Sequence, residues 1–146
     1  MMTVHPYLNF PGTTEAAFDF YKSVFGGAYA MVQRFGDGPG GEKVPDSVKN
    51  KIMHIALPLR ADCILMGTDA LPEMGFKLIE GNNFRIMLGV DSREEADKFF
   101  NALVAGGKAD QPMSDMFWGA YYGELSDKFG IKWMLNHHPR PPHVKP

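Results

Sequence analysis

The sequence has little of what would tie the protein to a secreted, membrane or nucleic-acid-binding class. It contains one cysteine in 146 residues, so no disulfide can form within the chain. No stretch approaches the ~18 apolar residues of a membrane span, and no basic segment precedes a long apolar run at the N-terminus. The 15 Lys and Arg residues are balanced by 17 Asp and Glu residues, which gives a net charge of −2 and no basic surface. We therefore expect a cytoplasmic protein with neither a membrane nor a nucleic-acid partner.

What the sequence does have is a regular alternation of strand-like and helix-like segments. Helices are predicted where apolar residues recur at helical spacing between a capping residue, Thr13 or Thr14 in one case and Ser92 in the other, and a Gly-Gly pair. Glu95 follows Ser92 at the spacing of a capping box. Strands are predicted over 4–10, 28–35, 51–59, 62–68, 83–90, 109–113, 120–125 and 131–136.

The two halves of this pattern overlay at an offset of 80 residues. Leu8 then meets Leu88, Phe20 meets Phe100, and the Gly-Gly pair 26–27 meets the pair 106–107. Strand, cap, helix face and stop signal all match in one register, which indicates a duplication. The sequence therefore predicts an α+β fold of tandem βαβββ modules that form a curved mixed sheet around a pocket. We expect one domain over 1–146, with modules at about 3–70 and 82–137 and a Pro/His-rich tail at 138–146.

The alternation of side chains along a strand separates helix-facing from pocket-facing residues. In the first strand the apolar set, which includes Val4, Leu8 and Phe10, should meet the helix. The matching strand should likewise turn Phe84, Ile86, Leu88 and Val90 to its helix. The pocket-facing residues predicted by this rule include His5, Tyr7, Asn9, His54, Arg85, Met87, Gly89, Lys132, Met134 and Asn136. Cys63 lies in an apolar run and is expected to be a buried thiol.

Several segments resemble the PhnB-like branch of the vicinal oxygen chelate superfamily. The resemblance covers about residues 3 to 136. The segments that carry it are His5–Phe10, Ala17–Lys22 with Phe25–Gly27, Ile52–His54, Leu65–Asp69, Phe117–Gly123 and Ser126–Met134. This branch is also labelled demethylubiquinone methyltransferase-like, although the chain has no glycine-rich nucleotide loop after a strand.

The resemblance implies where a metal would bind. Metal enzymes of the wider superfamily place His or Glu ligands on the first and fourth strands of each module, and those positions fall near His5, Met66, Arg85 and Met134. Of these, His5 suits a hard metal ion. A divalent metal is therefore a possible cofactor, with His5 and Glu124 as candidate ligands.

Three functions stay open from the sequence, and whether the protein is an enzyme stays open with them. The first is a PhnB-like protein that binds a small anionic or aromatic molecule through His5, Tyr7, His54 and Arg85, with Phe117, Trp118 and Tyr122 for stacking. The second is a metal-dependent lyase or dioxygenase that uses His5, His54 and Glu124. The third is a bleomycin-resistance-like protein that sequesters an antibiotic without chemistry.

The assembly state is a further expectation. The resemblance, together with the edges that curved open sheets leave uncovered, implies a homodimer. The loop that carries Trp118 could instead be a structural plug or a dimer contact, since aromatic side chains are common at interfaces as well as in pockets.

Overall fold

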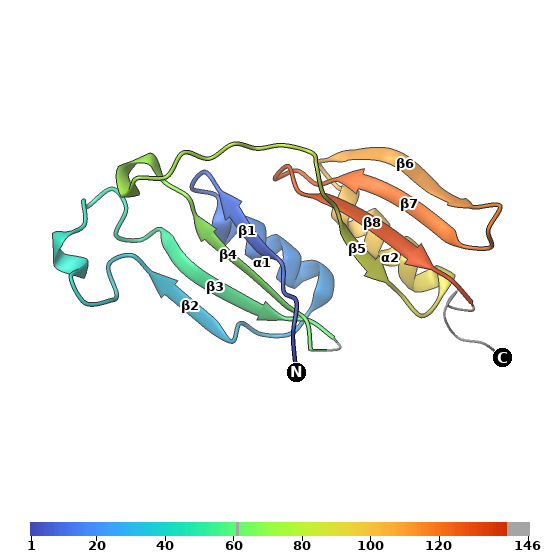
Figure 1. Cartoon of the computed structure of the whole chain (residues 1–146), viewed down its shortest axis with the longest axis horizontal. Coiled ribbons are helices and arrows are strands. Elements are labelled where there is room, and N and C mark those ends of the chain that lie inside the picture. The colour runs from blue at the N-terminus through green and yellow to red at the C-terminus, as the bar shows by residue number, and fades with distance from the viewer. Residues whose placement is uncertain (61, 140–146) are drawn as a thin grey trace. The chain divides into compact units, whose positions relative to one another are not determined.

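The structure is a computed structural model that describes residues 1–60 and 62–139. The chain divides into two compact units, Met1–Ile79 and a second unit that begins at Glu80 (Figure 1). Each unit contains one strand, one long helix and three further strands, in that order. This confirms the predicted α+β fold with two βαβββ modules.

The first unit forms a four-stranded sheet in the order β1-β4-β3-β2. Strands β1 and β4 are parallel, and the other neighbouring pairs are antiparallel. Its elements are β1 (Tyr7–Phe10), α1 (Thr14–Phe25), β2 (Met31–Arg34), β3 (Ile52–Pro58) and β4 (Ile64–Asp69), with short 3-10 turns at Gly41–Lys43 and Pro72–Met74.

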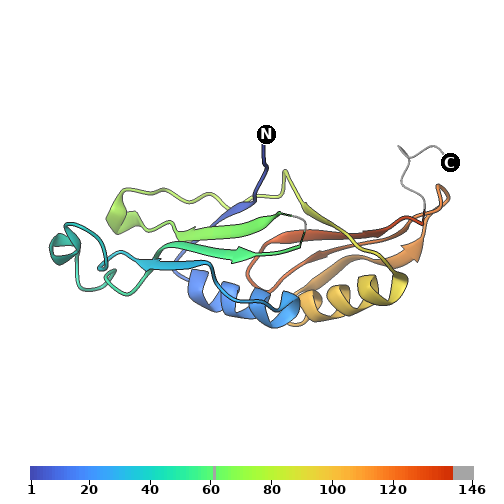
Figure 2. The same ribbon diagram turned by 90° about the horizontal axis from the view of Figure 1, so that it is seen from below.

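Helix α1 packs closely on one face of this sheet (Figure 2). A Cβ atom added to Gly67 would lie 2.7 Å from Cε2 of Phe18, so the glycine lets the helix approach the strand. Leu8 pairs with Gly67 across β1 and β4, and its side chain is buried. Tyr7 and Met66, one residue earlier in each strand, consequently lie on the face opposite α1.

The segment between β2 and β3 contributes to the core. Val48 is buried with Phe35 and Leu71, and Met53 and Met74 pack against this cluster. Val44 also packs against the cluster. Two valines among Gly, Pro and Asp are too short a pattern to mark a strand or helix, so the sequence could not identify Val48 as a core residue.

The second unit repeats the same topology. Its sheet has the order β5-β8-β7-β6, with β5 and β8 parallel and the other neighbouring pairs antiparallel. Its elements are β5 (Ile86–Gly89), α2 (Arg93–Val104), β6 (Lys108–Asp115), β7 (Tyr121–Ser126) and β8 (Lys132–His137).

The starts of the two helices differ in how they are capped. The capping box of α2 is confirmed, because Ser92 Oγ accepts from Glu95 N at 3.0 Å. Thr13 occupies the N-cap position of α1 but makes no side-chain capping bond. Asp69 Oδ1 instead accepts from Thr14 N at 3.0 Å, while its Oδ2 accepts from Ile52 N at 2.8 Å. One buried carboxylate therefore joins α1, β3 and β4.

Some predicted details are wrong, mostly at strand ends. Val4 is 81% exposed and Phe84 is 62% exposed, because each precedes the first paired residue of its strand and so lies beyond the reach of its helix. Strand β6 starts one residue earlier than predicted and ends two residues later. The thiol of Cys63 is half-buried rather than buried, and this partial burial raises its pKa. The part of the predicted tail over 140–146 lies outside the described residues.

The lengths of the helices test whether one of them could span a membrane. The two α-helices, α1 and α2, have 12 residues each. Within 1–60 and 62–139, no helix is long and apolar enough to cross a bilayer.

Candidate functional site

The candidate site lies on the face of the second sheet opposite α2. Gly123 marks the face toward α2, because a Cβ added there would lie 3.1 Å from Cε2 of Phe100. Leu125, Trp133 and Leu135 are fully buried on that same side. Strand alternation then defines the face opposite α2 by the remaining residues: Arg85, Met87, Gly89, Tyr122, Glu124, Ser126, Lys132, Met134 and Asn136.

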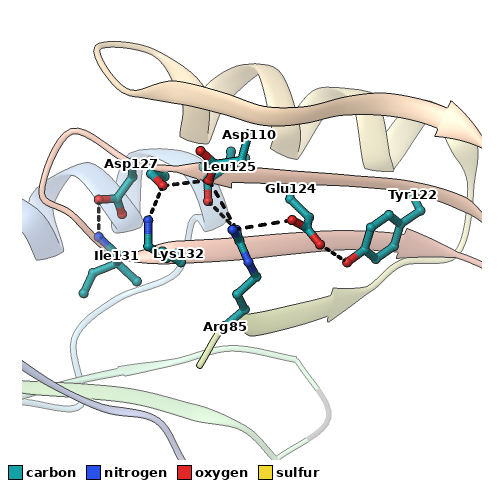
Figure 3. A network of polar contacts seen from close by, with 9 residues as sticks. Arg85, Asp110, Tyr122, Glu124, Leu125, Asp127, Ile131 and Lys132 are labelled. Atoms are coloured by element: carbon teal, nitrogen blue, oxygen red, sulfur yellow. Dashed lines mark hydrogen bonds and ion pairs between the residues drawn. The ribbon is translucent and has the colours of Figure 1, made fainter. Parts of the chain in front are cut away.

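Arg85 is the centre of a polar network on this face (Figure 3). Its Nη1 lies 3.3 Å from Oδ2 of Asp110, and its Nη2 lies 3.4 Å from Oε2 of Glu124. Nη1 also donates to the carbonyl oxygen of Leu125 at 3.4 Å. The side chains of Arg85, Asp110 and Glu124 are only 23%, 20% and 26% exposed. The guanidinium thus holds two carboxylates together in a mostly buried position.

The network extends from Glu124 to a phenol. Tyr122 Oη donates to Oε1 of Glu124 at 2.5 Å (Figure 3). Burial, followed by this hydrogen bond and the charge of Glu124, raises the pKa of Tyr122 to about 12. At neutral pH Tyr122 is therefore a neutral hydrogen-bond donor.

A second branch leads from Asp110 to an ammonium group. Ser126 Oγ donates to Oδ2 of Asp110 at 2.7 Å, and Lys132 Nζ donates to Ser126 Oγ at 2.8 Å. The Ser126 hydroxyl, and after it Arg85, lowers the pKa of Asp110. Arg85 and Lys132 are thereby matched by Asp110 and Glu124, so these four charges sum to zero.

Asp127 fixes the turn from which Lys132 emerges. Its Oδ1 accepts from the backbone N–H of Ile131 at 3.0 Å (Figure 3). The same oxygen accepts from the backbone N–H of Phe129 at 2.8 Å. Its Oδ2 accepts from Nε1 of Trp133 at 2.9 Å. Asp127 is 4% exposed, so this carboxylate is a structural support for the β7–β8 hairpin.

Two of the predicted site residues in the first unit contact each other. Tyr7 Oη and His54 Nδ1 lie 3.2 Å apart, and the rings stack at a centroid distance of 5.6 Å. Burial raises the pKa of Tyr7. His5 makes a different contact: its Nδ1 accepts a hydrogen bond from the backbone N–H of Ile64 at 3.0 Å. His5 thus has a structural role in holding the start of β4.

Trp118 extends the aromatic side of the site in the second unit. It lies on the β6–β7 connection, 51% exposed, with its ring 6.4 Å from that of Tyr122. The neighbouring Phe117 is 98% exposed and packs edge-on against Trp118 at 4.9 Å. Arg85, Tyr122, Glu124 and Trp118 therefore form a continuous group, while His5, Tyr7 and His54 belong to the first unit.

Sequence reasoning did not identify Asp110 as a site residue. Strand β6 shifts register twice, between Ala109 and Gln111 and between Gln111 and Ser114. Such shifts break strand alternation, so no pattern in the sequence places the carboxylate beside Arg85. Glu124 was predicted only as a metal ligand, and the alternation of Tyr122, Glu124 and Ser126 along β7 is the signal that could have placed these side chains on one face.

The residues at the implied metal positions do not fit a hard divalent ion. They supply one imidazole, two thioethers and a guanidinium, and a protonated guanidinium cannot ligate. His5 Nδ1 already accepts from Ile64, and Glu124 is bound to Arg85 and Tyr122. Across 1–60 and 62–139, no three His, Cys, Asp or Glu side chains form a group that could hold a metal. These residues therefore do not form a divalent-metal site of the kind that the resemblance implies.

Comparison with known proteins assigns the family. The profile of the family described as 3-demethylubiquinone-9 3-methyltransferase matches residues 2–136. The chain belongs to this family. The match spans both units, which agrees with the PhnB-like resemblance in the sequence.

Relatives and solved structures agree with this assignment. Protein YjdN of Escherichia coli (strain K12) is 30% identical over 92% of this chain and 95% of that protein. Protein PA1353 from Pseudomonas aeruginosa has 36% identity and a TM-score of 0.83, covering 94% of this chain and 98% of its own. A PhnB protein from Bacillus cereus has 21% identity and a TM-score of 0.73, covering 93% and 99%.

The fold extends to more distant proteins. A glyoxalase-related enzyme from Fulvimarina pelagi has 17% identity and a TM-score of 0.64, covering 95% of this chain and 90% of its own. This likeness concerns the fold, and it confirms the glyoxalase/bleomycin-resistance-like architecture.

Proposed function

We propose that the protein is a PhnB-like small-molecule-binding protein whose ligand lies on the face of the second sheet opposite α2. The observation that carries this proposal is the Arg85–Glu124–Tyr122 chain of contacts. Ionisable groups that are three-quarters buried on a sheet face are costly to the fold, and such groups concentrate at functional sites. Small-molecule sites typically combine a few convergent polar groups with apolar surface.

The sequence predicted an anionic or an aromatic ligand, and the charges of the network favour the aromatic one. Arg85 is already neutralised by Asp110 and Glu124, so a strongly anionic ligand would have to displace a carboxylate. Met87, which is 58% exposed, pairs with Met134 beside the network. Flexible thioether side chains suit the flat face of a ring. We therefore propose an aromatic ligand that carries hydroxyl or carbonyl groups. Tyr122 would contact either the ring of this ligand or its polar groups.

The proposal includes binding and no reaction. The family description names methyl transfer, and a nucleotide-type methyl donor would need a glycine-rich loop between a strand and a helix. The turn between β1 and α1 contains one glycine, Gly12, and the turn between β5 and α2 contains none.

A thermal-shift screen of small aromatic hydroxy and carbonyl compounds tests the proposal. A ligand at 100 times its Kd should stabilise the fold by about 2.7 kcal/mol, which corresponds to a rise in Tm of about 5–10 °C. The Arg85→Met and Tyr122→Phe variants should lose this shift. Arg93→Met is the matched control, because Arg93 also binds a carboxylate, that of Asp115, but on α2. Equal shifts in all four proteins, or shifts only with strongly anionic compounds, would contradict the proposal.

The two alternative functions have their own tests. Purification without chelators followed by metal analysis tests the metal-dependent lyase or dioxygenase, which predicts about one metal ion per site. Binding without turnover of the bound compound would favour the sequestering function.

We also propose that the protein is a homodimer, as the resemblance implies. Light scattering of the purified chain measures this directly, and a monomer mass across micromolar concentrations would refute it.

A further inference from the structure

Gly89 is a glycine that neither the backbone nor the packing of the fold requires. It is the last residue of β5, it is exposed, and its φ lies outside the positive range that favours glycine. A Cβ added to Gly89 would meet no atom within 4 Å. The sheet glycines Gly67 and Gly123 differ, because an added Cβ would lie 2.7 Å from Phe18 and 3.1 Å from Phe100 respectively.

A cleft of about 420 Å³ begins at this glycine. Val90 and Asp91 continue its wall from the end of β5, and Asn136, His137 and His138 form the wall from the end of β8. Glycine in a strand costs about 0.5–1 kcal/mol relative to alanine. The fold offers no packing gain that offsets this cost at Gly89, whereas a ligand that enters the cleft would.

The cleft lies beside the proposed ligand site in the register of the sheet. Gly89 pairs with Asn136, and Asn136 pairs with Tyr122 across β8 and β7. These residues form one row on the face opposite α2, next to the row of Met87, Met134 and Glu124. A ring above the two methionines would therefore point one edge toward the cleft.

The groups around the cleft include hydrogen-bond acceptors. His137 Nδ1 lies 3.0 Å from the carbonyl oxygen of Val90, and because a carbonyl only accepts, Nδ1 carries the proton. Nε2 of the neutral ring is then an acceptor. The Asn136 side-chain oxygen adds an acceptor to the same lining.

We infer that Gly89 keeps open a subsite for the hydrogen-bond-donating end of the ligand, a hydroxyl or amino group. This inference rests on the proposed function and deepens it. Gly89 acts as a specificity-determining position, because any larger side chain would occupy the space that the donor group enters.

Phenol and its methyl ether, anisole, are probes that test the subsite. At millimolar concentrations phenol should shift the backbone amide resonances of Gly89, Val90 and Asn136 in NMR spectra of the full chain, and anisole should shift them several-fold less. Equal shifts from the two probes, or shifts from neither, would overturn the subsite.

Gly89→Leu is the decisive variant, with Gly81→Leu as its matched control. A Cβ added to Gly81 also meets no atom within 4 Å, its φ is likewise not positive, and it does not line the cleft. Gly89→Leu should have a Tm at or above that of the parent and lose at least tenfold in phenol affinity, and Gly89→Ala should have an intermediate affinity. Gly81→Leu should bind as the parent does. A folded Gly89→Leu protein with parental affinity would overturn the inference.

The outcomes separate this inference from the proposed function. Shifts at Met87 and Tyr122 that persist in Gly89→Leu and vanish in Arg85→Met would leave the proposed function standing and refute the subsite. Shifts at none of these residues with any aromatic probe would refute both.

Discussion

Replacing Arg85 with methionine is the most informative perturbation of the candidate site. The change keeps a long, flexible apolar side chain and removes the guanidinium from between Asp110 and Glu124. Two mostly buried carboxylates then share one position on the sheet without the cation that separates them. Lys132 remains, but it reaches Asp110 only through the Ser126 hydroxyl.

The expected loss of stability lies between two known limits. An exposed ion pair contributes about 0–1 kcal/mol, and removal of one partner from a fully buried pair costs about 3–5 kcal/mol. Arg85 is 23% exposed and its ion-pair distances of 3.3 and 3.4 Å are long. We therefore expect a loss of about 2 kcal/mol, which lowers the Tm of a chain this size by about 4–8 °C.

Urea unfolding at pH 7, followed by circular dichroism, measures the loss. Combining Arg85→Met with Glu124→Gln closes a double-mutant cycle, and we expect a coupling of about 1 kcal/mol because the side chains are in contact. Arg93→Met is the control: its pair with Asp115 is 50% and 72% exposed, so its loss of stability should be smaller than that of Arg85→Met.

Two results would refute this reasoning. An Arg85→Met protein as stable as the parent would mean that the network does not stabilise the fold. Strict additivity of Arg85→Met and Glu124→Gln would mean that the two side chains do not interact in solution.

The network and the core around it allow further predictions. In an alkaline ultraviolet titration, Tyr122→Phe should lose an ionisation step near pH 12; because the folded pKa is raised, the Tyr122 contribution to stability is present below about pH 10 and is lost as the pH rises further. The folded pKa of Asp110 is lowered, so its contribution is present at pH 7 and is lost as the pH falls below about 4; the stability gap between the parent and Asp110→Asn should close there, and a constant gap would refute the pairing. Gly67→Ala should cost about 1–3 kcal/mol in urea unfolding because its Cβ would meet Phe18 at 2.7 Å, and a neutral change would contradict the packing of α1. Asp127→Ala should cost about 3 kcal/mol or more, since three donors lose their acceptor, and a loss below about 1 kcal/mol would disprove its supporting role.

The sequence predicted the fold well where local signals agreed with each other. Ser92, Glu95 and the following apolar positions specify α2 through a cap and a helical face, and the structure has both. The strand ends were less predictable. Val4 and Phe84 carry apolar side chains just outside the sheet, and nothing in the pattern says where pairing begins.

The alternation of side chains along strands predicted part of the candidate site. Alternation placed Arg85 and Lys132 on one side of their strands, and the structure brings both into one network. Alternation could not reveal that Arg85 is held by Asp110, because the register shifts of β6 change which side chains that strand presents. Nor could it show that Asp69, far along the chain, replaces the cap of α1.

Methionine-methyl NMR tests the central claim, ligand binding on the face opposite α2, most directly. Met87 and Met134 lie in register on that face, while Met53 and Met74 pack against the Phe35–Val48–Leu71 cluster of the first unit and act as internal controls. Adding an aromatic hydroxy compound that stabilises the protein should shift the Met87 and Met134 methyl resonances and leave those of Met53 and Met74 in place. Shifts confined to the control methionines, or no shift at Met87 and Met134 under saturating ligand, would contradict the claim.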